Sequence, residues 1–499
     1  MLSALVMLSA CFKDDTSPAT GSISEITIVD GTVEAVYDID KNQTLTVTPQ
    51  VIQTMSNQQI TYTWEVDQKV HSHAKEFVFV GNELGTFQCR LVVENEDGKA
   101  FFPFELNVNS PYEEGITVLS YDENGKSMLS FMLKQRAEGV EEFFMDENSF
   151  EVNNPEEPFA SYAVDMQQSG GSLILLCRGD ENKGEPGTIY FIDEKTFVLE
   201  NVLYVSEYSD FRPLKMFVPA NGSAGTAYPI LCENGKVYEL STIEGAIGEA
   251  AKFKSTYALG GMIYDSGSAM YNNMYLWDNV VGGLAMNYNG YGPYFFSTGY
   301  HAHFSDQGEL VDQNGQPTTT YFDAGEKPIF MCLVKTLGKS SPYSDVIILI
   351  TQKGMYRSYN LGEGYWRYNE ETGNNDLLDG GGAKLAGPTA DLNLQTPHVA
   401  TTLYSQLYYA TGNKIKRWNY EQRDWLNKAK EHAVIGSADA IITAMELSSD
   451  HLETYVAFYE PNETGKNGHV WIIDTETGEV KRKYANVAYR PTKIIYKKK

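Results

Sequence analysis

The chain has 499 residues, of which 42% are hydrophobic and 12% aromatic, a composition typical of a folded globular protein with room for two or three domains. Its 66 acidic and 39 basic residues give a formal charge of -27. A nucleic-acid partner is therefore excluded, because most of the surface would repel a phosphate backbone.

The first residues form an apolar run that ends in a cysteine. The run ends in Leu8-Ser9-Ala10-Cys11, and this pattern resembles the lipobox of bacterial lipoproteins. The resemblance implies cleavage before Cys11, with diacylglycerol on its sulfur and a further acyl chain on its nitrogen, which would anchor the chain in a membrane. Residues 1–10 are then part of a signal peptide, without the usual Lys or Arg before the run. The alternative is a short apolar segment with a chance cysteine.

Residues 11–22 are polar and acidic. The stretch Phe12-Lys13-Asp14-Asp15-Thr16-Ser17-Pro18 resembles the export signal that directs lipoproteins of Bacteroidetes-type bacteria to the outer face of the outer membrane. The resemblance implies a lipidated tether, with outer-membrane lipid bound through the acyl chains of Cys11 and the protein facing the extracellular side. No later apolar stretch approaches the roughly 20 residues that span a bilayer. An ordinary flexible linker would have the same composition.

Residues 23–110 alternate apolar and polar side chains in short runs between turn signals, which predicts an immunoglobulin-sized antiparallel β-sandwich. The stretches Tyr62–Trp64, Leu84–Phe87, Val92–Asn95 and Val108–Gly115 resemble the PKD-like domain of Bacteroidetes surface lipoproteins. In that family the strand tryptophan packs into the core, and the tyrosine-glycine exit leads into a second domain. The resemblance implies a spacer or a binding module.

From residue 115 to residue 499, a β-rich run, a turn with Gly or Asn, and a second β-rich run recur at intervals of about 45 to 70 residues, a spacing typical of propeller blades. Gly and Asn supply the positive φ that tight hairpin turns require. We therefore predict an all-β chain whose sandwich is followed by a β-propeller of about seven blades, with two successive sandwiches as the competing fold. The predicted hairpins are Ile116–Leu133, Leu173–Ile192, Tyr228–Leu240, Met274–Asn287, Val346–Tyr359, Leu407–Tyr420 and Tyr455–Ile473.

Two His-x-His pairs could place both imidazoles on one face of a strand, where a metal ion could bind. They are His71 with His73 and His301 with His303. No third ligand follows from the spacing, so we interpret these residues as exposed loop histidines and predict no metal site.

The cysteines after Cys11 are too far apart for a zinc site or a redox pair. They are Cys89, Cys177, Cys232 and Cys332, and we interpret the first three, which lie in strand-like apolar runs, as small core residues. The chain also lacks a Gly-x-Ser-x-Gly elbow, a His-Glu-x-x-His helix and a complete phosphate-binding loop. We therefore predict no catalytic residues and no cofactor.

Aromatic residues alternate with Gly and Asn between residues 257 and 322. Aromatic rings provide a large contact area at low entropy cost, and Gly and Asn allow close approach of the backbone to a ligand. The candidate rings for binding a ligand or partner are Tyr291, Tyr294 and Tyr300, with a second cluster at Tyr365, Trp366 and Tyr368. The alternative is that these rings fill the core between blades.

Taken together, the lipobox, the acidic tether, the PKD-like region and the propeller-like remainder resemble the accessory lipoproteins of SusC/SusD-type TonB-dependent uptake systems. The resemblance implies a non-catalytic cell-surface protein that binds oligomeric nutrients, peptide or glycan, and/or docks on the transporter complex. The alternatives are a surface hydrolase with carboxylates in a propeller channel and a stand-alone adhesin or architectural subunit. The composition does not separate a peptide ligand from a glycan.

Overall fold

The computed structural model describes residues 23–498, except for 57, 138–139, 147, 219–226, 242–243, 250–258, 266–272, 280, 289–290, 296–301, 321, 323–324, 335–345, 353–354, 360–365, 370–373, 378–390 and 421–428. The chain divides into two compact units, Met1–Pro111 and Tyr112–Lys499, which we call the amino-terminal and carboxy-terminal units. The described residues are almost entirely β, with one short α-helix, α1 (Ser149–Asn153), and one 3-10 helix (Glu181–Lys183). Neither of these helices is long and apolar enough to cross a bilayer.

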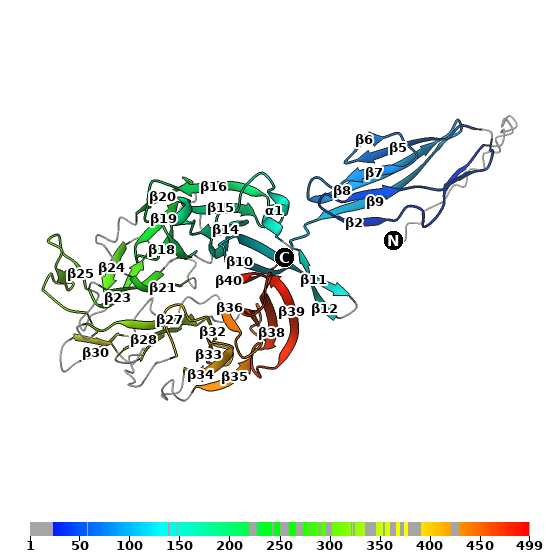
Figure 1. The fold of residues 1–499 in the computed structure, drawn as a ribbon. Coiled ribbons are helices and arrows are strands. Elements are labelled where there is room, and N and C mark those ends of the chain that lie inside the picture. The colour runs from blue at the N-terminus through cyan, green and yellow to red at the C-terminus, as the bar shows by residue number, and fades with distance from the viewer. Residues whose placement is uncertain are drawn as a thin grey trace, which may run out of the picture. The chain divides into compact units, whose positions relative to one another are not determined.

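The amino-terminal unit contains one five-stranded sheet and two two-stranded sheets among its described residues (Figure 1). The larger sheet has the order β2-β9-β8-β5-β6, and the small sheets pair β1 with β4 and β3 with β7. The β2–β9 pair is parallel, whereas the other pairs are antiparallel. The strands are β1 (Ile26–Ile28), β2 (Val36–Asp40), β3 (Thr44–Val47), β4 (Val51–Gln53), β5 (Thr61–Val66), β6 (Lys69–Ser72), β7 (Phe77–Val80), β8 (Gly85–Glu94) and β9 (Lys99–Asn109).

Trp64 lies at the centre of the core of this unit. Its side chain is fully buried, with its ring centroid 4.9 Å from that of Phe77 and 6.0 Å from that of Phe104. The indole N–H donates to the carbonyl of Ala74 (3.0 Å), so burial leaves no polar atom of this side chain unpaired. Residues of the five-stranded sheet and of the β3–β7 sheet share this core, so the two sheets form facing layers. The expectation of a core tryptophan is confirmed.

The carboxy-terminal unit forms seven successive antiparallel sheets in its described part, which we call blades 1 to 7 (Figure 1). The first strands of several neighbouring blades lie next to each other, as β13 does with β17, β21 with β27, β27 with β32, and β32 with β36. This radial succession of sheets is the architecture of a β-propeller. All seven predicted hairpins are present, each as two paired strands of one blade.

The strands of the blades have the following bounds. Blade 1 contains β10 (Gly115–Tyr121), β11 (Ser127–Ala137), β12 (Val140–Asp146) and β40 (Arg490–Lys497); blade 2 contains β13 (Ala163–Ser169), β14 (Ser172–Cys177), β15 (Gly187–Asp193) and β16 (Leu199–Val205). Blade 3 contains β17 (Pro213–Met216), β18 (Ala227–Cys232), β19 (Val237–Ser241) and β20 (Ala246–Glu249); blade 4 contains β21 (Leu259–Asp265), β22 (Asn273–Asp278), β23 (Gly283–Tyr288) and β24 (Tyr291–Phe295). Blade 5 contains β27 (Pro328–Val334), β28 (Val346–Thr351) and β29 (Met355–Tyr359); blade 6 contains β32 (His398–Thr401), β33 (Gln406–Thr411), β34 (Lys414–Asn419) and β35 (Lys430–Val434). Blade 7 contains β36 (Ile441–Leu447), β37 (Glu453–Tyr459), β38 (Gly468–Asp474) and β39 (Val480–Ala488); two small sheets pair β25 (His303–Phe304) with β26 (Leu310–Val311) and β30 (Trp366–Asn369) with β31 (Asn374–Leu377).

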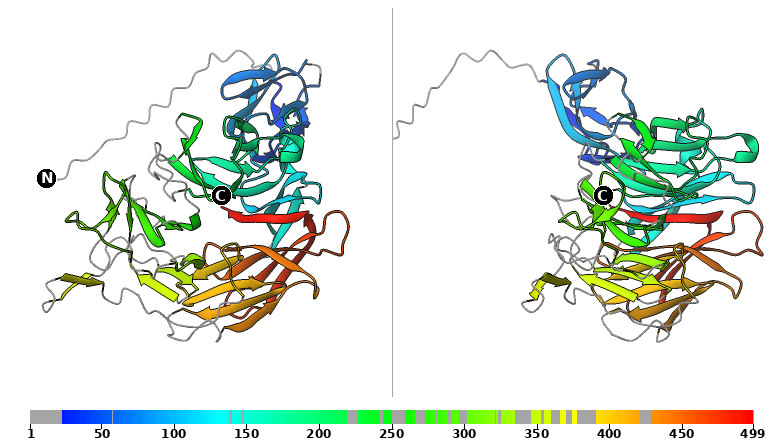
Figure 2. Two further views of the ribbon diagram at one scale, coloured as in Figure 1. Left: turned by 60° about the vertical axis from the view of Figure 1, so that its left-hand side comes forward. Right: turned by 90° about the vertical axis from the view of Figure 1, so that its left-hand side faces the viewer.

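The last strand of the chain completes blade 1. β40 pairs antiparallel with β10, with Gly115 opposite Lys497 and Val118 opposite Ile494. It also lies next to β36 of blade 7 and β13 of blade 2, and Figure 2 shows this red strand between the orange strands of blade 7 and the cyan to green strands of blades 1 and 2. The two ends of this unit thus close the ring, and the edges of β10 and β40 are paired instead of exposed.

A buried lysine holds the end of this closing strand. Lys497 is 2% exposed, and its Nζ donates to the carbonyl of Tyr112 and, at 3.3 Å, to that of Glu113. Burial lowers the pKa of Lys497 to about 8, although the charges of Glu194, Glu113 and Asp193 act in the opposite direction. The closing strand therefore ends on a cation that is fixed against backbone carbonyls.

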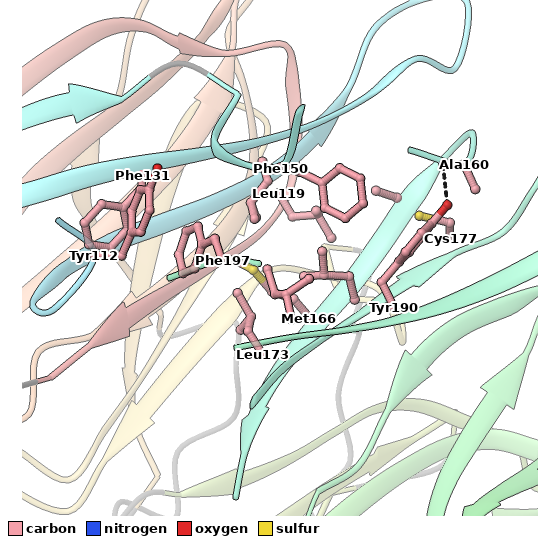
Figure 3. Packing of buried hydrophobic residues seen from close by; sticks show 14 residues of the cluster. Tyr112, Leu119, Phe131, Phe150, Ala160, Met166, Leu173, Cys177, Tyr190 and Phe197 are labelled. Carbon is pink, nitrogen blue, oxygen red and sulfur yellow. Dashed lines mark hydrogen bonds between the residues drawn. The ribbon is translucent and has the colours of Figure 1, made fainter. Parts of the chain in front are cut away.

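Aromatic rings fill the space between blades 1 and 2 (Figure 3). Tyr112 stacks on Phe197 with centroids 4.3 Å apart, and Phe131 meets these two rings edge-on at 5.3 and 5.5 Å. Tyr190 is also fully buried, and its hydroxyl accepts a hydrogen bond from the backbone N–H of Ala160 (2.9 Å). The first residue of the unit, Tyr112, therefore belongs to the core that joins its first two blades.

A one-residue β-bulge recurs in the innermost strands. In six of the seven blades the register between the innermost strand and its neighbour shifts by one residue, whereas β32 pairs with β33 without a shift. A bulge bends its strand and increases the local twist. The blades thus share a local geometry at the centre of the ring, although the extra residues differ: Val164, Leu214, Gly260, Ile329, Thr443 and Thr492.

Shortening the side chain of Ile494, in the closing strand β40, should destabilise the propeller. Ile494 is 1% exposed and packs in one core cluster with Ile116 and Val118. We expect Ile494→Ala to lower the free energy of unfolding by about 2–5 kcal/mol, because it removes buried methyl groups and leaves a cavity. Val434→Ala in β35 is the matched control; this valine is 46% exposed, so a change within about 0.5 kcal/mol is expected. Urea unfolding measures both, and equal effects would contradict the closure model.

Replacement of Lys497 should change how stability depends on pH. The pKa of this group falls from its usual 10.5 to about 8 in the folded protein, so between these values the unfolded chain binds more protons and the stability of the wild type rises with pH. Relative to Lys497→Met, the wild type should gain up to about 3 kcal/mol between about pH 7 and pH 10.5. Urea unfolding across this range tests the sign, with Lys430→Met, at an exposed lysine of β35, as the control. A difference that stays constant with pH would refute the assignment.

Candidate binding site

The aromatic residues singled out in the sequence belong to two different sheets. Tyr291 and Tyr294 lie in β24, the last strand of blade 4, and Trp366 and Tyr368 lie in β30, in the small sheet after blade 5. The binding role of these rings stays a prediction. The structure does not describe the side chains of Tyr291, Tyr294, Trp366 and Tyr368. Cys11, Tyr300 and Tyr365 lie outside the described residues.

One histidine of each pair lies in a strand and not in a loop, whereas His73 is exposed just after β6, as expected, and His301 lies outside the described residues. His71 belongs to β6, where its Nε2 lies 2.9 Å from the carbonyl oxygen of Val78, and His303 belongs to β25. Both are part of short hairpins that the alternation of apolar residues did not reveal. Across the residues that the structure describes, no three His, Cys, Asp or Glu side chains are placed to hold a metal ion.

The cysteines after Cys11 are buried free thiols; they are Cys89, Cys177, Cys232 and Cys332. This confirms the interpretation of the first three as core residues. Burial raises the pKa of Cys89 and of Cys232 to about 12, and it also raises the pKa of Cys177 and of Cys332 well above the usual value of a thiol. Because the thiolate is the nucleophilic form, these groups are inert at neutral pH.

A polar hollow of about 510 Å³ opens where blade 7 meets blade 1, and we call it the seam hollow. Its wall is formed by the residue just before β10, by β11, by the end of β40 and the residue after it, by the turn between β36 and β37, and by β37 and β39. Hydroxyl and charged groups dominate this wall. Its lining residues are Glu114, Lys134, Ser448, Ser449, Asp450, Leu452, Glu453, Tyr455, Lys481, Tyr496 and Lys498.

One side of the seam hollow is a three-residue cluster. Glu114 accepts hydrogen bonds from the hydroxyl of Tyr496 and from Nζ of Lys134 (3.1 Å), and Lys134 also lies 3.0 Å from the Tyr496 hydroxyl oxygen. Burial raises the pKa of Tyr496, and the hydrogen bond to the Glu114 carboxylate raises it further. Tyr455 stacks on Tyr496 with ring centroids 5.4 Å apart. The cluster joins β10, β11 and β40 through side chains.

The turn between β36 and β37 forms another side. Asp450 accepts hydrogen bonds from the hydroxyl of Ser448 (2.6 Å) and from the backbone N–H of Leu452 (3.0 Å). Burial alone would raise the pKa of Asp450, but these hydrogen bonds hold it below its usual range. The next residue, His451, adopts a positive φ of 60° and places its Nδ1 2.7 Å from the hydroxyl oxygen of Thr401. The turn is thus fixed by its own polar groups.

The third carboxylate of the seam hollow is also paired. Glu453 lies 3.7 Å from Nζ of Lys481 and 3.5 Å from the guanidinium of Arg482, and Lys481 in turn lies 3.1 Å from Asp474. All three acids of the wall therefore face hydrogen-bond donors or cations. The arrangement can donate and accept hydrogen bonds along a polar ligand, whereas a general acid requires a carboxyl with a raised pKa.

Analysis of the sequence did not find the seam hollow. Its residues come from positions 114, 134, 448–455, 481 and 496–498, which no motif connects. The run of lysines at the end of the chain, Tyr496-Lys-Lys-Lys499, marks a concentration of cations. It carries no information about Glu114 or Asp450, because pairing of β40 with β10 brings Glu114 to this run and packing of β36 against β40 brings Asp450.

No family model matches the chain, and no curated protein matches it. Solved structures do match. They include a quinonprotein alcohol dehydrogenase-like protein from Bacteroides thetaiotaomicron, 13% identical with a TM-score of 0.46, covering 95% of this chain and 99% of that one. An auxiliary nutrient binding protein from the same species is 12% identical with a TM-score of 0.33, covering 92% and 96%. The C-terminal WD40 domain of Sif2 is 12% identical with a TM-score of 0.35, covering 78% and 89%.

Removal of the Glu114 charge should lower the pKa of Tyr496. Glu114→Gln replaces the carboxylate that accepts the hydrogen bond of the tyrosine hydroxyl, and this carboxylate raises the pKa of Tyr496. Titration of carbon-13-labelled tyrosine followed by NMR measures the change, and Tyr496→Phe identifies the resonance. An unchanged or raised pKa would show that the side chains of this cluster are not in contact in solution.

Proposed function

We propose that this protein is a non-catalytic, lipid-anchored protein of the outer-membrane surface that binds oligomeric nutrients, peptide or glycan, and docks on a SusC/SusD-type transporter complex. In this proposal Cys11 carries the acyl chains and residues 12–22 form the tether. The amino-terminal unit is a PKD-like sandwich that acts as a spacer, and the propeller presents its two ends to the nutrient and the transporter. The sequence resemblances support the anchor, the tether and the transporter partner.

The observation that supports binding most directly is the charge arrangement of the seam hollow. Lys134 faces Glu114, and Lys481 faces Glu453, so cations and anions alternate along a wall that also contains hydroxyl groups. Peptides and glycans both present alternating donors and acceptors, and such a wall can satisfy them when they lose water. The seam hollow therefore suits reversible binding of a polar oligomer.

A hydrolytic role finds less support in the same site. Glycoside hydrolysis requires a pair of carboxyl groups of which one keeps its proton near neutral pH, so its pKa must be raised. In the seam hollow the pKa of Asp450 is shifted in the opposite direction, and Glu114 accepts hydrogen bonds from two donors. The geometry of the seam hollow therefore fits reversible binding of a nutrient better than hydrolysis.

Tethering to the membrane gives such capture its advantage. A nutrient bound to a protein in the same membrane as the transporter stays near the transporter mouth, because the tether limits the volume that it can explore. The gain is an increase in effective concentration and needs no tight binding at the seam hollow.

Purification from the native outer membrane tests this proposal. We expect mild-detergent extraction of the tagged protein to recover a TonB-dependent barrel and its SusD-like lid, as identified by mass spectrometry. Cys11→Ser is the matched control, because it removes the acylated sulfur and should release the protein from the membrane fraction. Recovery of the protein alone would overturn the transporter role, and membrane retention of Cys11→Ser would overturn the anchor.

A further inference from the structure

Three tyrosine rings and two guanidinium groups form a series of contacts along one end of blades 7, 1 and 2. The order is Tyr459, Arg490, Tyr121, Tyr162 and Arg178, and we call this set the Arg–Tyr row. The Cζ atom of Arg490 lies 5.3 Å from the ring centroid of Tyr459 and 5.9 Å from that of Tyr121. The Tyr121 and Tyr162 centroids are 5.3 Å apart, and Cζ of Arg178 lies 4.7 Å from the Tyr162 centroid. Five side chains from three blades thus form one continuous series.

The backbone fixes the positions of this row. Arg490 is the first residue of β40 and is paired with Tyr121, the last residue of β10. Tyr162 has a positive φ of 58°, and its N–H donates to the carbonyl of Gly125 (2.8 Å). A Cβ at Gly125 would lie 2.5 Å from the ring of Tyr162, so this position requires glycine. The N–H of Arg178 donates to the carbonyl of Tyr162 (2.9 Å). The row therefore does not depend on chance orientations of surface side chains.

One cation of the row has no acidic partner. Arg178 pairs with Glu233 at 2.6 Å, whereas the exposed guanidinium of Arg490 makes no ion pair or hydrogen bond within the described part of the chain. The nearby Glu460 accepts hydrogen bonds from the N–H and hydroxyl of Ser437 instead. In a chain with a net charge of -27, this is an exposed arginine, flanked by two aromatic rings, whose planar donors are available to an anion.

We propose that the Arg–Tyr row binds an anionic glycan through the carboxylates of its uronic acid residues. A pyranose ring offers a flat C–H face that can cover a tyrosine ring, and its carboxylate lies at the ring edge, within reach of a guanidinium beside that tyrosine. An acidic peptide carries its carboxylates on flexible stems and has no flat apolar face to cover the tyrosines. The placement of guanidinium groups beside tyrosine rings therefore favours a uronic-acid glycan over an acidic peptide.

This site is separate from the seam hollow. Arg490 and Tyr121 lie at the start of β40 and the end of β10, whereas the seam hollow is lined by Tyr496 and Glu114, at the end of β40 and just before β10. The two sites thus lie at opposite ends of the same pair of strands. The inference rests on the proposed role in nutrient binding and specifies one class of nutrient, a uronic-acid glycan.

Calorimetric titration of the full chain with an oligogalacturonate tests the inference. We expect binding that weakens with added salt, and Arg490→Gln should weaken it by about tenfold or more, since it removes a charge-assisted hydrogen-bonding group. Arg490→Lys keeps the charge but loses the planar pair of donors, so an intermediate loss is expected. The matched control is Arg90→Gln, which should bind as the wild type does. Arg90 also lies over an aromatic ring, with Cζ 5.5 Å from the Phe101 centroid, but in the amino-terminal unit and paired with Glu65.

Three results would overturn the inference. The first is a wild type that does not bind the oligogalacturonate; the second is an equal loss in Arg90→Gln. The third is oligoglutamate binding with the same dependence on Arg490, which would make the row a site for acidic peptides. If the wild type fails to bind while the protein still copurifies with a transporter, only this inference fails and the proposed function stands.

Discussion

The pairing of β40 with β10 is the contact on which the rest of the carboxy-terminal unit depends. It places Ile494 opposite Val118, turns a row of seven sheets into a ring, and leaves Lys497 buried against the carbonyls of Tyr112 and Glu113. The same pairing builds both candidate sites, because β40 contributes Tyr496 to the seam hollow and Arg490 to the Arg–Tyr row. One strand thus contributes both to the stability of the propeller and to its two candidate sites.

The ring is regular at its centre and variable elsewhere. Six innermost strands contain a one-residue bulge, at residues as different as Val164, Gly260 and Thr492. Because a bulge changes backbone direction and twist, its position is constrained by how closely the innermost strands approach one another, whereas its side chain is less constrained. Thr492 adds a specific contact, since its hydroxyl donates to the carbonyls of Leu119 (3.2 Å) and Ala163 (2.9 Å) and so links blades 1 and 2.

The net charge of the chain does not describe the local charge around the two candidate sites. The chain is strongly acidic, yet carboxylates around both sites already accept hydrogen bonds or form ion pairs, as Asp450, Glu114 and Glu233 do. Such local pairing neutralises the acids where they would repel an anion, and it leaves Arg490 with its donors exposed. An acidic protein can therefore present a cationic site, because charge interactions across a solvated surface are screened within about 10 Å.

The sequence by itself determined what depends on neighbours along the chain. Alternating side chains and turn residues predicted the seven hairpins, and apolar context predicted that Cys89, Cys177 and Cys232 are buried. The resemblance to PKD-like domains implied the same for Trp64. It also placed the second region at 115–499, and the compact units divide after Pro111. Only the tertiary structure decided the closure of blade 1, the seam hollow and the Arg–Tyr row. Each of these joins residues separated by more than 350 positions, such as Tyr121 and Arg490. Turn chemistry and periodicity act over a few residues, so no local pattern could specify which distant strands would meet.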